Sequence, residues 1–410
     1  MRYIFDFTNY KDQNYTLILV SVALFFSSFT TVLIPSLDYM ALSIKNNNHT
    51  FYNYATIATL AASLPPACSL LNGYLVNNIA YKTLTNMTCG MVMFLYIIIF
   101  FYHQNFLVYT VLVILCGILL NALFLGLDRQ IVTLLANKIK EFQNDAFILN
   151  GLLAIINYKI SNYLFLHFEL HGIIVYCLFL NAILFICLNA ISTAPKVSSN
   201  YISKHKLPNI KVLLKILLEH EKLIIFLVIM LSIMFISSGL TLLLTTKIHH
   251  ENLPTSLWSS NMAFMAFGGL LGAIICKVRV FQNINSILII CIAEVLFGIC
   301  LISISIVHLA NLLIAILWFC GFLNPFILIN MNTVFLKYVS NYSELISISP
   351  VVNGLTSSAF YIVCLIGPII LNQLLQVSID YKLLLVICGI LEILIAIILI
   401  NIKGLKTNFP

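Results

Sequence analysis

The fold is decided by two apolar runs, GILLNALFLGLDRQ (residues 117–130) and AFILNGLLAIINYKIS (residues 146–161), which flank a charged connection. About 203 positions later the pattern returns, with Gly321 for Gly117, Asn324 for Asn121, and Asn353-Gly354-Leu355 for Asn150-Gly151-Leu152. A second motif, Ser27-Ser28 with Thr31, returns as Ser237-Ser238 with Thr241. Since half of 410 residues is 205, the sequence indicates an internal duplication, in which each half of the chain is one repeat.

The composition indicates an integral membrane protein. Hydrophobic residues make up 61 % of the chain and charged residues only 9 %, and the mean hydropathy is +1.04. A soluble domain is about one quarter charged. The apolar runs are continuous over about 20 residues, which is the length of a membrane-spanning helix and not of an alternating barrel strand. The 11 cysteines fall mostly within these runs and show no metal-binding spacing, so we expect no metal site and no bound cofactor.

The predicted fold is an all-α bundle of twelve transmembrane helices in two parallel six-helix repeats. The expected units are an N-terminal bundle (1–193), a basic central loop (194–222) and a C-terminal bundle (223–410). The spans are expected near 15–40, 53–76, 84–102, 107–127, 146–167, 172–193, 223–246, 257–276, 285–307, 311–335, 345–374 and 382–402.

Basic residues predict the orientation of the bundle. With both termini in the cytoplasm, the inner segments carry 17 Lys and Arg residues and the outer segments carry 3. This excess on one side follows the positive-inside rule. The net charge of +7 is therefore a topology signal and gives no reason to expect a nucleic-acid partner. The minimal loops favour a bacterial cytoplasmic (inner) membrane protein.

With its twelve spans, basic central loop and six-plus-six repeat, the chain resembles the major facilitator superfamily. The family motif between spans two and three is represented by Gly73, Asn77 and Lys82, although Asn77 replaces an acidic residue. The resemblance implies alternating access to a site between the halves, an ion gradient (most readily protons) as the energy source, and a monomer in the lipid bilayer.

A narrower resemblance concerns the start of the duplicated pattern. Arg129 at the inner end of span four, and the segment from Ala146 to Asn150, are similar to a subgroup that includes macrolide effluxers and the enterobactin exporter. This resemblance implies export of a drug-like or siderophore-like solute. Uptake of a nutrient or a metal chelate is the alternative within the same fold.

No enzyme motif is found, so polar residues inside the spans are the candidate functional residues. Helical spacing places them in stripes that are predicted to line a substrate cavity: Ser27, Thr31, Asn121, Asn150, Asn157, Ser161, Ser238, Thr241, Asn353, Ser357 and Tyr361. The alternative for each residue is a hydrogen bond to a neighbouring helix.

Charged residues in or near the spans are candidates for coupling or gating: Asp38, Asp128, Arg129, Lys159, Glu294 and Glu392. Glu294 and Glu392 each lie about ten residues into a span, near mid-membrane, where a carboxyl group could bind a proton. Spans nine and twelve are outer scaffold in the resembled family, so the alternative is a protonated glutamate packed against span ten or eleven. Lys159 lies on the opposite face of its helix from Asn150, so it is expected to snorkel outward or to pair between helices. Arg129 and Lys159 favour a polycarboxylate solute.

We therefore predict a secondary transporter of a small organic solute. A transporter-shaped sensor or a membrane-embedded enzyme without a transport cycle is the alternative from a different functional class.

Overall fold

The computed structural model describes residues 13–43, 48–69, 72, 79–134, 139–191, 221–276, 284–340 and 349–401. Within these ranges, the following side chains lie outside the description: 128–141, 143–144, 222, 255, 332–333, 336–340 and 349–357.

The described residues form helices and contain no β-strand. The N-terminal half contains α1 (Gln13–Ser28), η2 (Phe29–Leu33), α2 (Ile34–Leu42), α3 (Asn48–Ala67), α5 (Tyr81–Tyr102), α6 (Phe106–Leu134) and α7 (Ile139–Ala190). The C-terminal half contains α9 (Glu221–Ser238), α10 (Leu240–His250), α11 (Thr255–Cys276), α13 (Ser286–Ile306), α14 (Ala310–Ser340), α16 (Ser349–Gln376) and α17 (Tyr381–Asn401). Helices satisfy their own backbone groups, which is what an apolar run in lipid requires.

Among the described residues, 10 segments are long and apolar enough to cross a membrane, and the chain is a multi-pass membrane protein. One of them, Asp145–Ala190, has 46 residues. This is about 69 Å of helix, far more than the ~30 Å that a crossing requires. The segment turns back at Glu169, which has a φ of 51°, between the ranges predicted for spans five and six. The polar helix α3 is not among the 10 segments, so the count of twelve spans stays a prediction.

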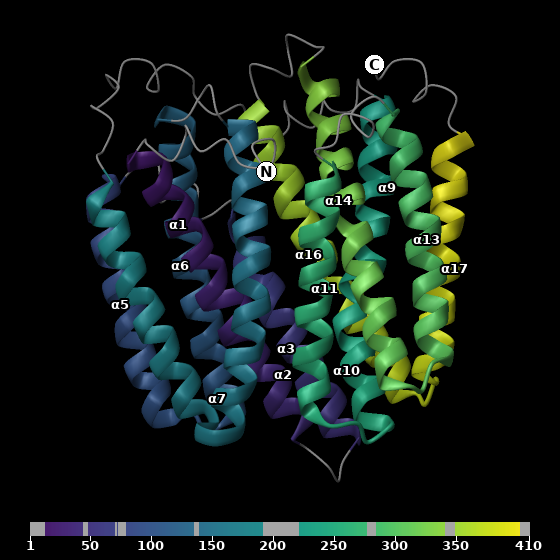
Figure 1. Cartoon of the computed structure of the whole chain (residues 1–410), viewed down its shortest axis with the longest axis horizontal. Helices are drawn as coiled ribbons and strands as arrows, with labels where there is room; N and C mark the ends of the chain where they lie inside the picture. The colour runs from purple at the N-terminus through teal and green to yellow at the C-terminus, as the bar shows by residue number, and fades with distance from the viewer. Residues whose placement is uncertain are drawn as a thin grey trace.

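The helices lie side by side, with those of the N-terminal half at one side of the bundle and those of the C-terminal half at the other (Figure 1). The halves meet where α7 packs against α11 and where α3 packs against α16. Large apolar side chains such as Phe94, Phe101 and Ile398 are exposed on the periphery, as expected for a surface that faces lipid.

The two glycines of the duplicated pattern lie at close helix crossings. A Cβ atom added to Gly117 of α6 would lie 2.5 Å from Pro65 of α3. A Cβ atom added to Gly321 of α14 would collide with the carbonyl oxygen of Met265 of α11. Small residues let the backbones of membrane helices approach each other in this way.

The repeated serine–threonine motif coincides with two breaks in regular helix geometry. The first motif runs into the π-helical turn η2, which leads into Pro35. The second motif contains Gly239, where α9 ends and α10 begins. Such breaks free backbone groups and often mark functional sites. Both breaks border the cavity described next.

Candidate functional site

A cavity of about 280 Å³ lies between the two halves. Its wall is formed by Thr30, Ile34, Pro35, Asp38, Ala58, Thr59, Ala62, Ser63, Tyr158, Ser237, Ser238, Thr241, Trp258, Met262 and Cys364. The first nine residues come from the N-terminal half and the other six from the C-terminal half. A solute held here would contact both halves at once.

Asp38 is the only acidic or basic side chain on the described wall. It is 3 % exposed, and its Oδ1 atom has no hydrogen-bond partner among the described residues. It interacts electrostatically with the hydroxyl group of Tyr158 across the α2–α7 contact. A buried carboxyl group with an unsatisfied oxygen is costly, and it is available to bind a proton or a cationic group.

An aromatic corner adjoins Asp38. The indole Nε1 of Trp258 donates a hydrogen bond of 3.2 Å to Thr245 Oγ1, which fixes the orientation of the ring. The Trp258 ring makes T-shaped contacts with Tyr39, at a centroid distance of 5.4 Å, and with Tyr158, at 6.0 Å. Aromatic faces beside a carboxyl group can receive the apolar body and the positive charge of one solute.

Ser237, Ser238 and Thr241 line the opposite wall. The hydroxyl group of Ser238 donates to the carbonyl oxygen of Phe235 at 2.8 Å, so it keeps its oxygen lone pairs for a solute. The hydroxyl group of Ser237 donates to Glu392 Oε1 at 3.4 Å, away from the cavity. This wall therefore offers mainly acceptor oxygens.

Three of the residues predicted from the sequence, Asp38, Ser238 and Thr241, lie on the cavity wall. Four others are buried in contacts between helices: Ser27, Thr31, Asn157 and Ser161. The Nδ2 group of Asn157 donates to Thr31 Oγ1 at 3.1 Å, and its Oδ1 atom accepts from the Tyr176 hydroxyl group at 2.9 Å. Asn157 therefore makes the hydrogen bond to a neighbouring helix that was the alternative to lining the cavity.

The remaining predicted wall residues that the structure describes lie off the cavity. Asn121 donates to the carbonyl oxygen of Pro65 at 2.8 Å and so joins α6 to α3. Asn150 is half-buried, and its Oδ1 atom has no described partner. Tyr361 is 38 % exposed, three residues before Cys364, which does line the cavity.

Several predicted residues lie outside the described residues or side chains. Gly73 and Asn77 belong to the first group, while the side chains of Asp128, Arg129, Asn353 and Ser357 belong to the second. Lys82, the last residue of the family motif, is exposed in the first turn of α5.

Lys159 does not line the cavity. Its Nζ atom donates a hydrogen bond of 2.7 Å to Ser260 Oγ of α11, so the side chain links the two halves. Pairing between helices was one of the two outcomes expected from its position. The described wall is left without a basic group, which bears on the chemistry of the solute.

Glu294 and Glu392 are fully buried in the C-terminal half, on α13 and α17. Their carboxyl groups interact with each other, and Ser237 links Glu392 to the cavity wall. Neither glutamate lines the cavity.

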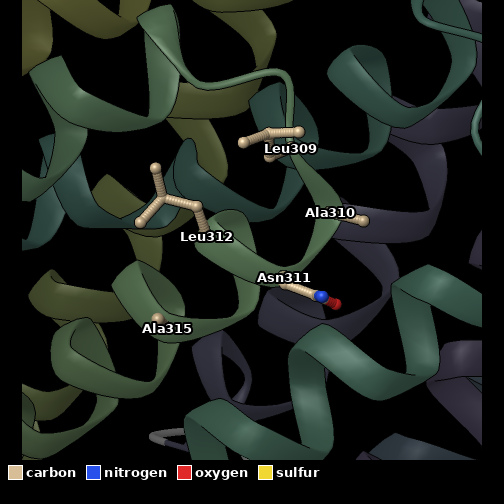
Figure 2. Close-up of a pocket in the computed structure, with 5 residues that line it drawn as sticks. All are labelled: Leu309, Ala310, Asn311, Leu312 and Ala315. Atoms are coloured by element: carbon tan, nitrogen blue, oxygen red, sulfur yellow. The ribbon is translucent and has the colours of Figure 1, made fainter.

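A second, larger hollow of about 520 Å³ lies at the start of α14. Figure 2 shows its five lining residues, which all come from one short segment: Leu309, Ala310, Asn311, Leu312 and Ala315. Leu309 is 71 % exposed, and none of the five side chains is ionisable. This hollow is a feature of the surface and lacks the convergent polar groups of a binding site.

At the predicted outer end of the bundle, side chains from both halves meet. The Tyr52 hydroxyl group of α3 lies 2.5 Å from His250 Nε2 of α10, and Phe51 stacks on His249 at 3.8 Å. The Nε2 group of Gln376 of α16 donates to Asn53 Oδ1 of α3 at 2.7 Å. We refer to Phe51, Tyr52, Asn53, His249, His250 and Gln376 as the outer contact.

The two histidines of the outer contact have aromatic and hydrogen-bonding neighbours, namely Phe51, Tyr52 and Tyr381. No group of three or more His, Cys, Asp or Glu side chains that could hold a metal ion occurs among the described residues.

Sequence reasoning missed Tyr158 and Trp258 as wall residues. Tyr158 directly follows Asn157, so the predicted face of α7 was one residue, or about 100° of rotation, away from the face that lines the cavity. Trp258 is one of only two tryptophans in the chain, and this rarity was the available signal.

The arrangement was compared with known proteins. No protein-family model matches the sequence, and no curated protein matches it. The structure of the nucleoside transporter NupG is similar with a TM-score of 0.68 and 14 % identity, over 96 % of this chain and 98 % of that chain. The human organic anion transporter MFSD10 (TETRAN) is similar with a TM-score of 0.68 and 12 % identity, over 94 % and 99 % of the two chains. A D-xylose–proton symporter is similar with a TM-score of 0.67 and 12 % identity, over 95 % and 97 %.

These likenesses establish the fold. The chain has the architecture of the major facilitator transporters, and all three solved relatives are transporters rather than enzymes. This confirms the predicted fold class. The narrower resemblance to the macrolide and enterobactin exporters is not established by these comparisons.

Proposed function

We propose that the chain is a proton-coupled secondary transporter that moves a small organic solute by alternating access through the cavity between its halves. The observation that carries the proposal is the placement of Asp38. A buried carboxyl group with an unsatisfied oxygen lies on a wall that both halves build. Such a group can exchange a proton with water when the cavity opens to one side, and it can hold that proton when the cavity is closed.

The chemistry of the described wall favours a neutral or cationic solute with an apolar body. Asp38 is its only charged side chain, Trp258 and Tyr158 supply aromatic surface, and the serine and threonine oxygens are acceptors. Of the two basic residues that favoured a polycarboxylate solute, Lys159 does not support it here, because its side chain is bonded to Ser260. Within the sequence-based alternatives, a drug-like solute therefore fits better than an anionic siderophore.

Export across a bacterial inner membrane, with both termini in the cytoplasm and the chain acting as a monomer, completes the proposal. Export rests on the sequence resemblance, and uptake of a nutrient is the alternative direction. Comparing the solutes in the medium of a deletion strain and its parent distinguishes the two. A solute depleted from the deletion-strain medium supports export, whereas a solute that remains there and disappears from the parent medium supports uptake.

The role of Asp38 is tested by Asp38→Asn in proteoliposomes. Solute accumulation driven by a pH gradient should be lost, because asparagine cannot exchange a proton. Glu169→Gln is the control, since Glu169 is exposed at the turn within α7 and does not line the cavity. Undiminished accumulation in a folded Asp38→Asn protein would overturn the assignment of this residue.

A further inference from the structure

Two buried carboxyl groups behind the cavity wall have no role in the proposal so far. Glu294 of α13 and Glu392 of α17 are each 0 % exposed. Neither carboxyl oxygen of Glu294 has a hydrogen bond of good geometry among the described residues, and Glu392 Oε2 also lacks one. An ionised carboxyl group without partners is strongly disfavoured in such a place.

The packing of α13 against α17 brings the two groups together. A Cβ atom added to Gly298 would lie 2.5 Å from the carbonyl oxygen of Gly389, and 3.3 Å from the Cβ atom of Glu392. Glu294 lies one turn before Gly298 on α13, and Glu392 lies nearly one turn after Gly389 on α17. The two carboxyl groups act on each other electrostatically across this crossing.

No cation compensates the pair within the described helices that pack around it. α13 and the described side chains of α14 contribute no Lys, Arg or His, and the Cys300–Cys320 thiol pair lies between these two helices. The described side chains of α9, which packs against α17, also include no Lys, Arg or His. Lys247 of α10 lies ten residues after Ser237 of α9, and Lys382 of α17 lies ten residues before Glu392, so each is about 15 Å away along the chain of helices. Glu392 also acts electrostatically on the Cys388 thiol, one turn before it on α17. The pair therefore requires at least one bound proton.

Ser237 connects this pair to the solute cavity. Its side chain lines the cavity, and its Oγ atom donates to Glu392 Oε1 at 3.4 Å. It lies two residues before Gly239, where α9 breaks from α10. A rearrangement of the cavity wall at this break would change the hydrogen bond to Glu392 and so the affinity of the pair for its proton.

Resting on the proposed function, we infer that Glu294 and Glu392 form a second proton-binding site, which is linked to the solute cavity through Ser237 and holds a proton that drives transport. The site binds and releases one proton without any covalent change. Asp38 then meets the solute, while the carboxyl pair stores the proton behind the wall.

The first test uses the proton itself as the probe and needs no solute. Infrared spectroscopy of the purified protein at neutral pH, in an Asp38→Asn background, should show a protonated carboxyl band. The band should disappear when Glu294→Gln and Glu392→Gln are combined. Ser237→Ala should keep the band and slow its hydrogen–deuterium exchange. An absent band, a band unchanged by the two glutamine substitutions, or exchange unchanged by Ser237→Ala would overturn the inference.

The second test separates this inference from the proposed function. In proteoliposomes, Glu392→Gln should keep solute counterflow without a gradient and lose accumulation driven by a pH gradient. If wild-type protein shows neither counterflow nor accumulation, the proposed function is wrong. The infrared experiment still decides, independently, whether the two glutamates share a bound proton. If Glu392→Gln retains full gradient-driven accumulation, the pair is scaffold and the inference is wrong.

Discussion

The Tyr52 hydroxyl group lies 2.5 Å from His250 Nε2, although 198 residues separate the two in the sequence. The bond joins α3 of the N-terminal half to α10 of the C-terminal half at the predicted outer end. His250 also stacks on Tyr381 with a centroid distance of 5.6 Å, so it ties α3 to α17 as well. Alternating access requires that such contacts break and re-form in each cycle, which makes this bond a direct target for mutation.

Tyr52→Phe should loosen the outer contact while leaving the ring in place. Loss of one hydrogen bond costs about 1 kcal/mol, which shifts a two-state equilibrium about fivefold toward the outward-open form. Electron paramagnetic resonance between spin labels on Gln104 and Leu309, exposed sites on opposite halves, measures the shift as longer distances.

Tyr54→Phe is the matched control for that variant, because Tyr54 is on the same helix but stacks on Phe106 within the N-terminal half, at 3.7 Å. Equal distance distributions for both variants and the wild type would show that the outer contact does not control opening.

Glu251, just after α10, should make the stability of the predicted outer end of the bundle depend on pH in the acidic range. Burial alone would raise the pKa of Glu251, but hydrogen bonds from Lys247 and Tyr381 more than offset it and lower the pKa below its ordinary value of 4.5. Its stabilising contribution is then complete above pH 4.5 and is lost as the pH falls through the lowered pKa. Thermal melting of the wild type should therefore decline in that acidic range.

Glu251→Gln should melt at a lower temperature at neutral pH, at a cost of about 2 kcal/mol, because the fully buried Lys247 loses its 2.8 Å ion pair. It should also lose most of the acid dependence. The matched control is Glu169→Gln, an exposed glutamate at the turn within α7. An acid dependence that is the same in Glu251→Gln as in the wild type would contradict the assignment.

Gly321→Ala tests the close crossing of α11 and α14. The new methyl group would collide with the carbonyl oxygen of Met265, so the helices must move apart, at a cost of about 1–3 kcal/mol. Gly90→Ala is the control, because nothing lies within 4 Å of a Cβ atom there. Thermal melting should be lowered by the first substitution and not by the second, and the same melting temperature for both would refute the crossing.

The fold could be predicted from the sequence because a helix that crosses a membrane must be apolar along its whole length. Continuous apolar runs predicted the helices, and the return of Gly117 as Gly321 indicated equivalent packing positions. A Cβ atom at Gly117 would collide with the Phe29 and Pro65 side chains, and one at Gly321 would collide with the Met265 backbone. The turn between spans five and six was placed within a few residues of Glu169 for the same reason.

The cavity face was harder to predict, because hydrogen bonds between helices and exposure to a cavity select the same residue types. Asn157 and Thr31 bond to each other at 3.1 Å and leave the wall to Tyr158 and Thr30, their neighbours in sequence. The π-helical turn η2 also shifts the register of span one, so a stripe counted at 3.6 residues per turn does not stay on one face. Neither the hydrogen-bond partner of a polar residue nor the π-helical break can be recognised from the spacing of polar residues along one helix.

The central claim, that this cavity is the route of transport, is tested most directly by the accessibility of single cysteines in a cysteine-free background. Thr241 lies on the cavity wall, and Asn157, which is 1 % exposed and bonded on both sides, is the matched buried control. In sided vesicles, Thr241→Cys should react with a membrane-impermeant thiol reagent from both faces, while Asn157→Cys stays protected. Adding Tyr52→Phe should speed the reaction of Thr241→Cys from the outer face and slow it from the inner face. Reaction of Thr241→Cys from one face only, with no response to Tyr52→Phe, would contradict alternating access through this cavity.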